Sequence, residues 1–251
     1  MTGSSTSEAA RFTASLVLFL FLLAASGVCP AQAEPIETGG TISGLVRYGG
    51  ATPSPAPLAI TKDREVCGTS PVFDQSLVVG GNGGISNVVV TVVDVKGGQS
   101  LKPERAVRFD QKGCEYVPHV IVFPAGSTVV IINSDGILHN IHTESDVNPV
   151  IDLAQPGFKR QIRVTIAKPE IIKVTCDAHN WMEGWWYVTA TPYYAITDSQ
   201  GRYRIHGLPA GPYTLRVWQE RLGTEEERVV VRSGSQTTAD FVFKPIKSRG
   251  S

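Results

Sequence analysis

The sequence predicts an all-β protein, and three observations lead to that prediction. Runs of β-branched residues, such as residues 88–93, favour a buried strand and disfavour a helix. Short apolar runs are separated at close intervals by turn-forming residues, in a chain that holds 25 Gly and 16 Pro. Long amphipathic helical periodicity is absent from the sequence. This combination is typical of β-sandwiches.

The N-terminal segment has the order of a secretory signal peptide. A positively charged residue precedes an apolar run over residues 12–25, and an A-x-A sequence follows at residues 31–33. We therefore expect a signal peptide over residues 1–33, cleaved after Ala33. A permanent anchor is the alternative, but a spanning helix needs a longer run of about 20 apolar residues. The mature protein is expected to be periplasmic or secreted, with no membrane segment after cleavage.

After residue 40 the chain is expected to form short strands. The first covers residues 41–48, and residues 49–84 make a loop-rich connection to the second. The remaining strands are expected at residues 88–93, 106–109, 119–123, 127–132, 161–166, 170–175, 185–191, 202–205, 213–218, 228–232 and 237–243.

Composition excludes two classes of protein. Lys and Arg total 23 and Asp and Glu total 23, so the formal net charge is zero. A nucleic-acid binder that works by bulk positive charge would need a basic excess to neutralise phosphates. The hydrophobic content of 42% is enough to bury a core, which excludes a largely disordered chain.

Signal cleavage changes the cysteine count. Cys29 leaves with the signal, and Cys67, Cys114 and Cys176 remain. In an oxidising compartment, the simplest interpretation is a structural disulfide between Cys67 and Cys114, neither of which has a histidine nearby. The thiol of Cys176 then needs another explanation.

Candidate chemistry concentrates at residues 176–182, where Cys176, His179 and Met182 have the spacing C-x2-H-x2-M. A loop between two strands can turn these side chains toward one point. The motif lacks the second cysteine and the spacing of a structural zinc site. A trigonal site of one Cys and two His with a weak axial Met is the blue-copper arrangement. His139, which follows the predicted strand at residues 127–132, supplies the second histidine.

Residues 105–190, about a third of the chain, resemble the plastocyanin/azurin class of cupredoxins. The resemblance is carried by the order of Tyr116-Val117-Pro118, the segment 124–129, Asn133 and His139-Asn140, and the ligand loop is similar to the compact loop of amicyanin. It implies a Greek-key β-sandwich that binds one copper ion per chain. The implied ligands are His139, Cys176, His179 and axial Met182, with Asn140 hydrogen-bonded to the ligand loop. The sequence departs from the family at Asp177, directly after the cysteine, and at residues 152–155, which do not align.

Other interpretations stay open for single residues. Cys176 is also compatible with a buried inert thiol, Met182 with a core residue and the two histidines with satisfied polar groups. His142 is expected on the opposite face of a strand and is not expected to be a ligand. His119 could approach the metal or bind a second one, whereas the segment around His206 is typical of a turn.

These residues favour an exported electron carrier rather than an enzyme, because four protein ligands leave no open position for a substrate. A redox protein is expected to dock near Trp181 and His179. The second hypothesis is a copper-handling or protein-binding module in which the metal is stored, delivered or structural. A third is an enzyme with water at an open copper position, in which His119 or His142 would matter.

The rest of the chain resembles a carboxypeptidase-regulatory, transthyretin-like β-sandwich. The resemblance is carried by residues 197–205 and 207–217, and the opening strands of that family are similar to residues 43–46 and 87–90. We expect residues 41–103 and 191–246 to form this sandwich, with the copper domain of residues 104–190 inserted between its strands. The alternative assigns the N-terminal strands to the copper domain. The combination resembles bacterial cupredoxin-like proteins of the methylamine-utilisation type.

Overall fold

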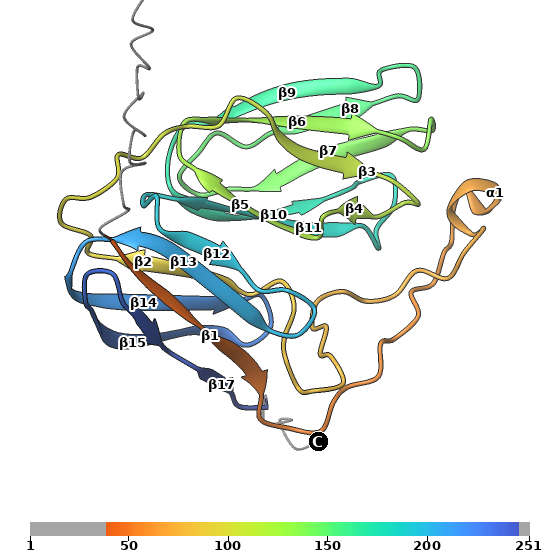
Figure 1. The fold of residues 1–251 in the computed structure, drawn as a ribbon. Coiled ribbons are helices and arrows are strands. Elements are labelled where there is room, and N and C mark those ends of the chain that lie inside the picture. Colours follow the sequence, from red (N-terminus) through yellow and green to blue (C-terminus); the bar gives the residue numbers. More distant parts are fainter. Residues whose placement is uncertain (1–38, 246–251) are drawn as a thin grey trace, which may run out of the picture. The chain divides into compact units, whose positions relative to one another are not determined.

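The computed structural model of this chain describes residues 39–245, which all belong to one compact unit. The signal-peptide prediction lies outside these residues. The regular secondary structure of the described chain is almost entirely strand, and the strands are arranged as two β-sandwiches, which confirms the predicted fold class (Figure 1). Within the described part, no helix is long and apolar enough to cross a membrane.

The first sandwich is built from both ends of the described chain. One of its sheets has the order β13-β1-β16, with β17 also paired to β1, and the other has the order β12-β2-β14-β15. The bounds of these strands are β1 Gly40–Tyr48, β2 Val89–Val93, β12 Tyr194–Ile196, β13 Arg202–Leu208, β14 Gly211–Gln219, β15 Gly223–Val231, β16 Gln236–Thr238 and β17 Phe241–Phe243. Because β1 pairs with β13 and β2 pairs with β14, the N-terminal and C-terminal segments share one core.

The second sandwich lies between β2 and β12 in the sequence. Its sheets have the orders β5-β11-β10-β7-β8 and β4-β3-β6-β9. The bounds are β3 Val107–Gln111, β4 Tyr116–Val117, β5 Val120–Pro124, β6 Ser127–Asn133, β7 His139–Glu144, β8 Asp152–Gln155, β9 Gln161–Ile166, β10 Glu170–Thr175 and β11 Glu183–Thr189. The pairs β3 with β6 and β5 with β11 are parallel, and the other strand pairs of this sandwich are antiparallel.

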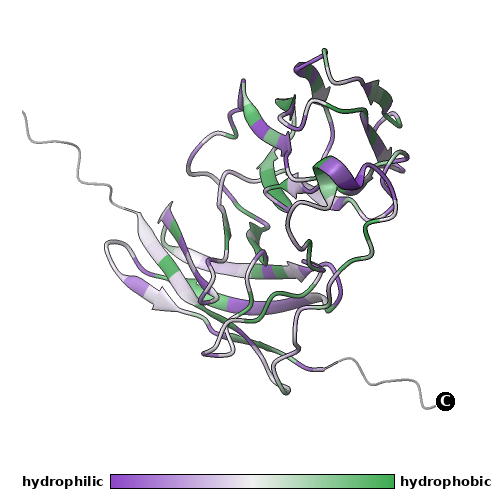
Figure 2. Ribbon diagram, turned by 90° about the vertical axis from the view of Figure 1, so that its right-hand side faces the viewer, coloured by the Kyte–Doolittle hydropathy of each residue, from purple (hydrophilic) through white to green (hydrophobic). Residues whose placement is uncertain are grey.

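Large aromatic residues fill the core of the second sandwich, and apolar positions recur along the strands of both sandwiches (Figure 2). Trp186 is fully buried and meets the ring of Phe109 edge-on, with 5.5 Å between ring centroids. Its neighbour Trp185 packs instead with Tyr187 and Trp218, where the two sandwiches touch. Adjacent strand residues point to opposite faces, so one tryptophan supports the core and the other supports the contact between sandwiches.

The strand predictions were incomplete, and the short strands β4 and β12 were among those not expected. β7 and β8 were not expected as strands, because their outward positions carry polar residues and the apolar runs are short. The expected strand over residues 237–243 is divided into β16 and β17. The connection over residues 49–84 contains one helical turn, α1, Arg64–Cys67.

The long connection after β1 is tied to the second sandwich by a disulfide. This connection is orange in Figure 1 and carries α1, and Cys67, the last residue of α1, is bonded to Cys114. Both cysteines are buried in the core of the second sandwich. The predicted disulfide is therefore confirmed, and it holds α1 against the end of the sandwich that carries the candidate site.

Candidate metal centre

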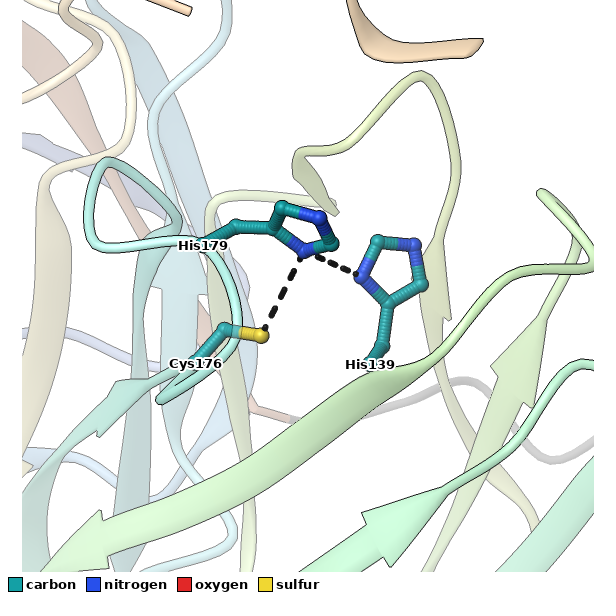
Figure 3. A group of neighbouring side chains, drawn as sticks. All are labelled: His139, Cys176 and His179. Atoms are coloured by element: carbon teal, nitrogen blue, oxygen red, sulfur yellow. Dashed lines mark hydrogen bonds between the residues drawn. The ribbon is translucent and has the colours of Figure 1, made fainter. Parts of the chain in front are cut away.

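His139, Cys176 and His179 converge at one buried point (Figure 3). His139 is the first residue of β7, and the other two lie in the loop between β10 and β11. Nδ1 of His139 lies 3.1 Å from Nδ1 of His179, and Sγ of Cys176 lies 3.8 Å from the same His179 nitrogen. The three donor atoms are all within 4.8 Å of one another, and the three residues are buried.

The ligand loop is positioned by a hairpin and by contacts from β7. Thr175 at the end of β10 is paired with Glu183 at the start of β11, so residues 176–182 close the hairpin. Inside the loop, the backbone N–H of Met182 donates to the carbonyl of His179 at 3.0 Å. The side chain of Met182 is buried in the same core as Cys176. The structure thus places the predicted axial residue at the base of the loop.

Asn140 and Tyr116 connect β7 to the ligand loop. The side-chain oxygen of Asn140 lies 3.5 Å from the backbone nitrogen of Asp177, directly after the cysteine. The buried hydroxyl of Tyr116 lies 2.6 Å from the carbonyl of Asn140 and 2.9 Å from that of Thr175. These contacts fix the spacing of the two segments that carry the donors.

Carboxylates hold the outer nitrogens of both histidines. Nε2 of His139 is 2.9 Å from Asp135, which also accepts the backbone N–H groups of Gly113 and Cys114. Nε2 of His179 is 2.8 Å from Asp63, which directly precedes α1. In the neutral imidazole, which is the form that binds a metal, a carboxylate at Nε2 favours the tautomer with its proton there and leaves the lone pair of Nδ1 directed inward. Two imidazole nitrogens and a sulfur facing one another make a donor set that fits a copper ion.

The same contacts shift the pKa values of the donors. Burial lowers the pKa of His139, but hydrogen bonds to Asp135 and Cys176 outweigh it and raise the pKa to about 8. Burial raises the pKa of the Cys176 thiol, but hydrogen bonds from His139 and from backbone N–H groups bring it below its ordinary value. Burial lowers the pKa of His179. The pocket therefore favours the thiolate, which is the form of cysteine that binds metals.

The structure does not bring the other histidines to this centre. Nε2 of the buried His119 contacts Glu220, which also accepts a hydrogen bond from Nε1 of Trp185 at 2.7 Å. His142 lies on the opposite face of β7 from His139 and contacts Asp177. His206 is exposed and lies 3.3 Å from the hydroxyl of Thr41.

One side of the centre is covered by the connection between β1 and β2. His179 is fully buried, and the ring of Trp181 packs on it with 5.0 Å between centroids. Nε1 of the half-buried Trp181 donates to the carbonyl of Cys114 at 3.2 Å. A hollow of about 280 Å³ opens beside this ring and is lined by residues that include Leu58, Val72, Phe73, Asn180, Trp181 and Met182.

Sequence reasoning missed Asp63 and Asp135 as partners of the two histidines. Asp135 carried a local signal, because it lies four residues before His139. Asp63 carried none, because it lies 116 residues from His179 in a loop-rich connection. The disulfide was the one predicted feature that places this connection near the candidate site.

Comparison with known proteins gives two kinds of likeness. A family described as the carboxypeptidase regulatory-like domain matches residues 187–244, which confirms the resemblance of the C-terminal segment. No curated protein matches the chain.

Among solved structures, the Cu-containing nitrite reductase from Thermus scotoductus SA-01 is 23% identical with a TM-score of 0.32, over 38% of this chain and 24% of the reductase. This chain therefore spans about a quarter of that enzyme. A purple cupredoxin from Nitrosopumilus maritimus is 22% identical with a TM-score of 0.28, over 33% of this chain and 99% of that protein. A mutant of amicyanin, as Cu(I), is 20% identical with a TM-score of 0.31, over 40% of this chain and 98% of that protein. The chain is thus similar to carboxypeptidase regulatory-like domains over residues 187–244 and has cupredoxins among its structural neighbours.

Proposed function

We propose that this protein is an exported electron carrier with one type 1 copper ion, bound by His139, Cys176 and His179 with Met182 as axial ligand. The observation that carries the proposal is the convergence of three donors from two segments, with the inner nitrogen of each imidazole directed at the other donors. When bound, copper would supply a one-electron couple between Cu(II) and Cu(I). Soft sulfur and borderline nitrogen donors suit both oxidation states.

The residues of the chain have three tasks in this function. Asp135 and Asp63 hold the imidazole rings in a fixed orientation and tautomer. The surrounding core excludes water, since His139 and His179 are both fully buried. The contacts of Tyr116 fix the two ligand-bearing segments to each other. A rigid, dry donor set changes little between oxidation states, which lowers the cost of electron transfer.

A carrier fits these residues better than an enzyme. Four donors from the chain leave no position for a substrate. His119 and His142, which an enzyme site would need as extra groups, contact Glu220 and Asp177 instead. The disulfide supports an exported location, because disulfides persist in oxidising compartments.

A redox partner would dock near Trp181 and His179. Asp63 covers the outer nitrogen of His179, so the half-buried ring of Trp181 is the more accessible of the two. The hollow beside Trp181 includes Phe73, which is 45% exposed. The hollow is lined by polar and acidic residues as well, so a partner that offers both apolar and polar groups would approach the centre here through the Trp181 ring.

Copper handling is the second candidate function, and the burial of His179 beneath Asp63 favours it. A site closed on this side would retain its metal until the connection moves. The two functions differ in what leaves the protein. A carrier keeps its copper ion while it exchanges electrons with a partner. A delivery protein transfers Cu(I) to a competing thiolate ligand, and this transfer is faster than its electron exchange.

Metal analysis combined with a visible spectrum of the purified protein tests the proposal. We expect one copper ion per chain to be bound at the buried centre and to give an intense visible band from thiolate-to-copper charge transfer, which reduction bleaches reversibly. Cys176→Ala should abolish the band, and His206→Ala, which removes an exposed histidine of the other sandwich, should keep it. Tight copper binding without the band, or a disulfide formed by Cys176 in the metal-loaded protein, would contradict the proposal.

A further inference from the structure

A second group of potential metal ligands lies outside the buried centre. It consists of His142, Asp152 and Asp177, which we call the outer triad. Each residue offers one donor atom, and the three atoms lie within 4.8 Å of one another. Nδ1 of His142 is 3.0 Å from the carboxylate of Asp177.

The sheet itself brings these residues together. In the antiparallel pair of β7 and β8, His142 is directly opposite Asp152. On the other side of β7, His142 is opposite Thr175, the last residue of β10, and Asp177 follows two residues later. Residues directly opposite in neighbouring strands share a face of the sheet. One imidazole and two carboxylates from adjacent chain segments therefore gather on one face.

This face is the opposite of the one that carries the buried centre. His139 and Ile141 point into the core and are fully buried. His142 points outward, because it is the third residue after His139 and strand side chains alternate between faces. Its side chain is 38% exposed and that of Asp177 is 54% exposed, so an ion from solvent can reach both. The outer triad is thus a separate candidate site.

The charges of the outer triad favour a cation. Two carboxylates face one imidazole, and Glu144 lies two residues beyond His142 on the same side of β7. Among the described residues, neither Asp152 nor Asp177 forms an ion pair with a lysine or arginine. Like charges placed side by side on a sheet repel each other unless a cation compensates them.

Asn140 orients the acidic members of the triad. Its side-chain nitrogen donates to the carboxylate of Asp152 at 2.7 Å, and its side-chain oxygen lies 3.5 Å from the backbone nitrogen of Asp177. An ion bound at about 2.0–2.2 Å from each donor needs donor atoms no more than about 4.4 Å apart. Small rotations of exposed side chains meet that requirement from the present geometry.

We propose that His142, Asp152 and Asp177 form a second metal site that binds a divalent first-row transition-metal ion, with Cu(II) bound more tightly than Zn(II). One imidazole nitrogen with carboxylate oxygens suits these ions, and the order of divalent affinities peaks at Cu(II). Water completes the coordination at this exposed position. Because no sulfur takes part, Cu(II) bound here gives no thiolate charge-transfer band. This proposal is independent of the function proposed for the buried centre.

Titration of the full mature protein with Cu(II) and with Zn(II) tests the proposal. Electron paramagnetic resonance of the Cu(II)-loaded protein shows whether an imidazole nitrogen binds the ion. His142→Ala removes a proposed ligand and should weaken Cu(II) binding at the outer triad at least about tenfold. A tenfold loss is about the smallest that removal of a residue supporting a ligand causes at metal sites. Asp152→Asn keeps the shape of the side chain and should weaken the same binding event. The matched control is His206→Ala, which removes an exposed histidine of the other sandwich and should change nothing.

The titration is repeated in the Cys176→Ala background, which disables the thiolate of the buried centre. In this background, we expect His142→Ala to remove the ion bound at the outer triad, as it does in the wild-type chain. The test of the outer triad therefore does not depend on whether the buried centre binds copper. The proposal is overturned if His142→Ala and Asp152→Asn both bind metal as the parent does. It is also overturned if His206→Ala causes an equal loss, or if Cys176→Ala alone removes the ion assigned to the outer triad.

Discussion

Asp63 and His179 form a 2.8 Å contact between residues that lie 116 positions apart in the chain. Asp63 belongs to the connection that leaves the first sandwich after β1, and His179 belongs to the ligand loop of the second. Cys67, four residues after Asp63, is bonded to Cys114, whose backbone N–H holds Asp135 on the other histidine. The disulfide therefore joins the two segments that orient the two imidazoles. The connection between β1 and β2 thus contributes directly to the geometry of the candidate centre.

Asp63→Asn should raise the reduction potential of the bound copper and weaken Cu(II) binding about tenfold. The carboxylate strengthens the hydrogen bond from Nε2 and increases the basicity of the imidazole, which favours Cu(II) over Cu(I). Asparagine tolerates the left-handed backbone that Asp63 adopts, with φ of 46°, so the loop should keep its path. Voltammetry and competition with a chelator measure the two effects.

Glu65→Gln is the matched control for this variant, because it removes one exposed negative charge from the same helical turn. It should leave the potential nearly unchanged, since exposed charges are screened by salt. Equal shifts in both variants would mean that Asp63 acts only through net charge and not through its contact with His179.

Replacement of both cysteines in Cys67→Ser/Cys114→Ser should lower the free energy of unfolding by about 2–4 kcal/mol. The disulfide closes a long stretch of chain, with a sequence separation of 47, and so limits the unfolded ensemble. Denaturant titration measures the loss. The visible band of the copper-loaded variant should also broaden, because both imidazoles lose a constraint. A band of unchanged shape would show that the two carboxylates keep their places without the disulfide.

The sequence carried a signal for the part of the candidate centre that is local in the chain. The motif of Cys176, His179 and Met182 lies in one loop, so its spacing alone suggested a shared site. His139 was proposed because a blue-copper site needs a second histidine and because it follows a predicted strand, and the resemblance to cupredoxins implied the same residue. The alternation rule placed His142 on the opposite face correctly.

What the sequence could not predict depends on contacts between distant segments. The carboxylate of Asp63 has no recognisable spacing to either histidine, and only the path of the long connection brings it to His179. Glu220 likewise meets His119 across the contact between the two sandwiches. β8 could not be assigned because its short sequence is exposed over most of its length, and its pairing with β7 decides its structure.

Glu170→Gln should destabilise the protein near neutral pH by about 1–2 kcal/mol, a value reduced for the partial exposure of the group. Burial raises the pKa of Glu170, but hydrogen bonds from Ser145 and from the Asn148 side chain, together with backbone N–H groups, outweigh it and lower the pKa from 4.5 to about 2. A lowered carboxyl pKa stabilises the folded state fully above the unfolded value. That stabilisation is lost as the pH falls from about 4.5 toward about 2.

The difference in unfolding free energy between wild type and Glu170→Gln should therefore shrink across that range of pH. Thermal or urea unfolding at several pH values measures it. Glu227→Gln, at an exposed position of β15, should show no such dependence. A difference that is constant with pH would indicate that the charge of Glu170 does not hold the loop after β7.

Met182→Leu tests the axial position. The side chain is buried with Cys176 in the same core, and leucine has a similar volume, so the fold should lose less than about 1.5 kcal/mol. If Met182 is a weak axial ligand, its loss leaves the three strong donors in place, and the variant should still bind one copper and keep the charge-transfer band. The reduction potential should rise, because an axial thioether that donates to the metal stabilises Cu(II) and leucine cannot replace that donation.

Voltammetry measures the shift, and Ile172→Val, a conservative change at another buried position of this core, serves as the packing control. An unchanged potential in Met182→Leu would assign Met182 to the core alone, because the axial interaction is the one contribution to the centre that leucine removes.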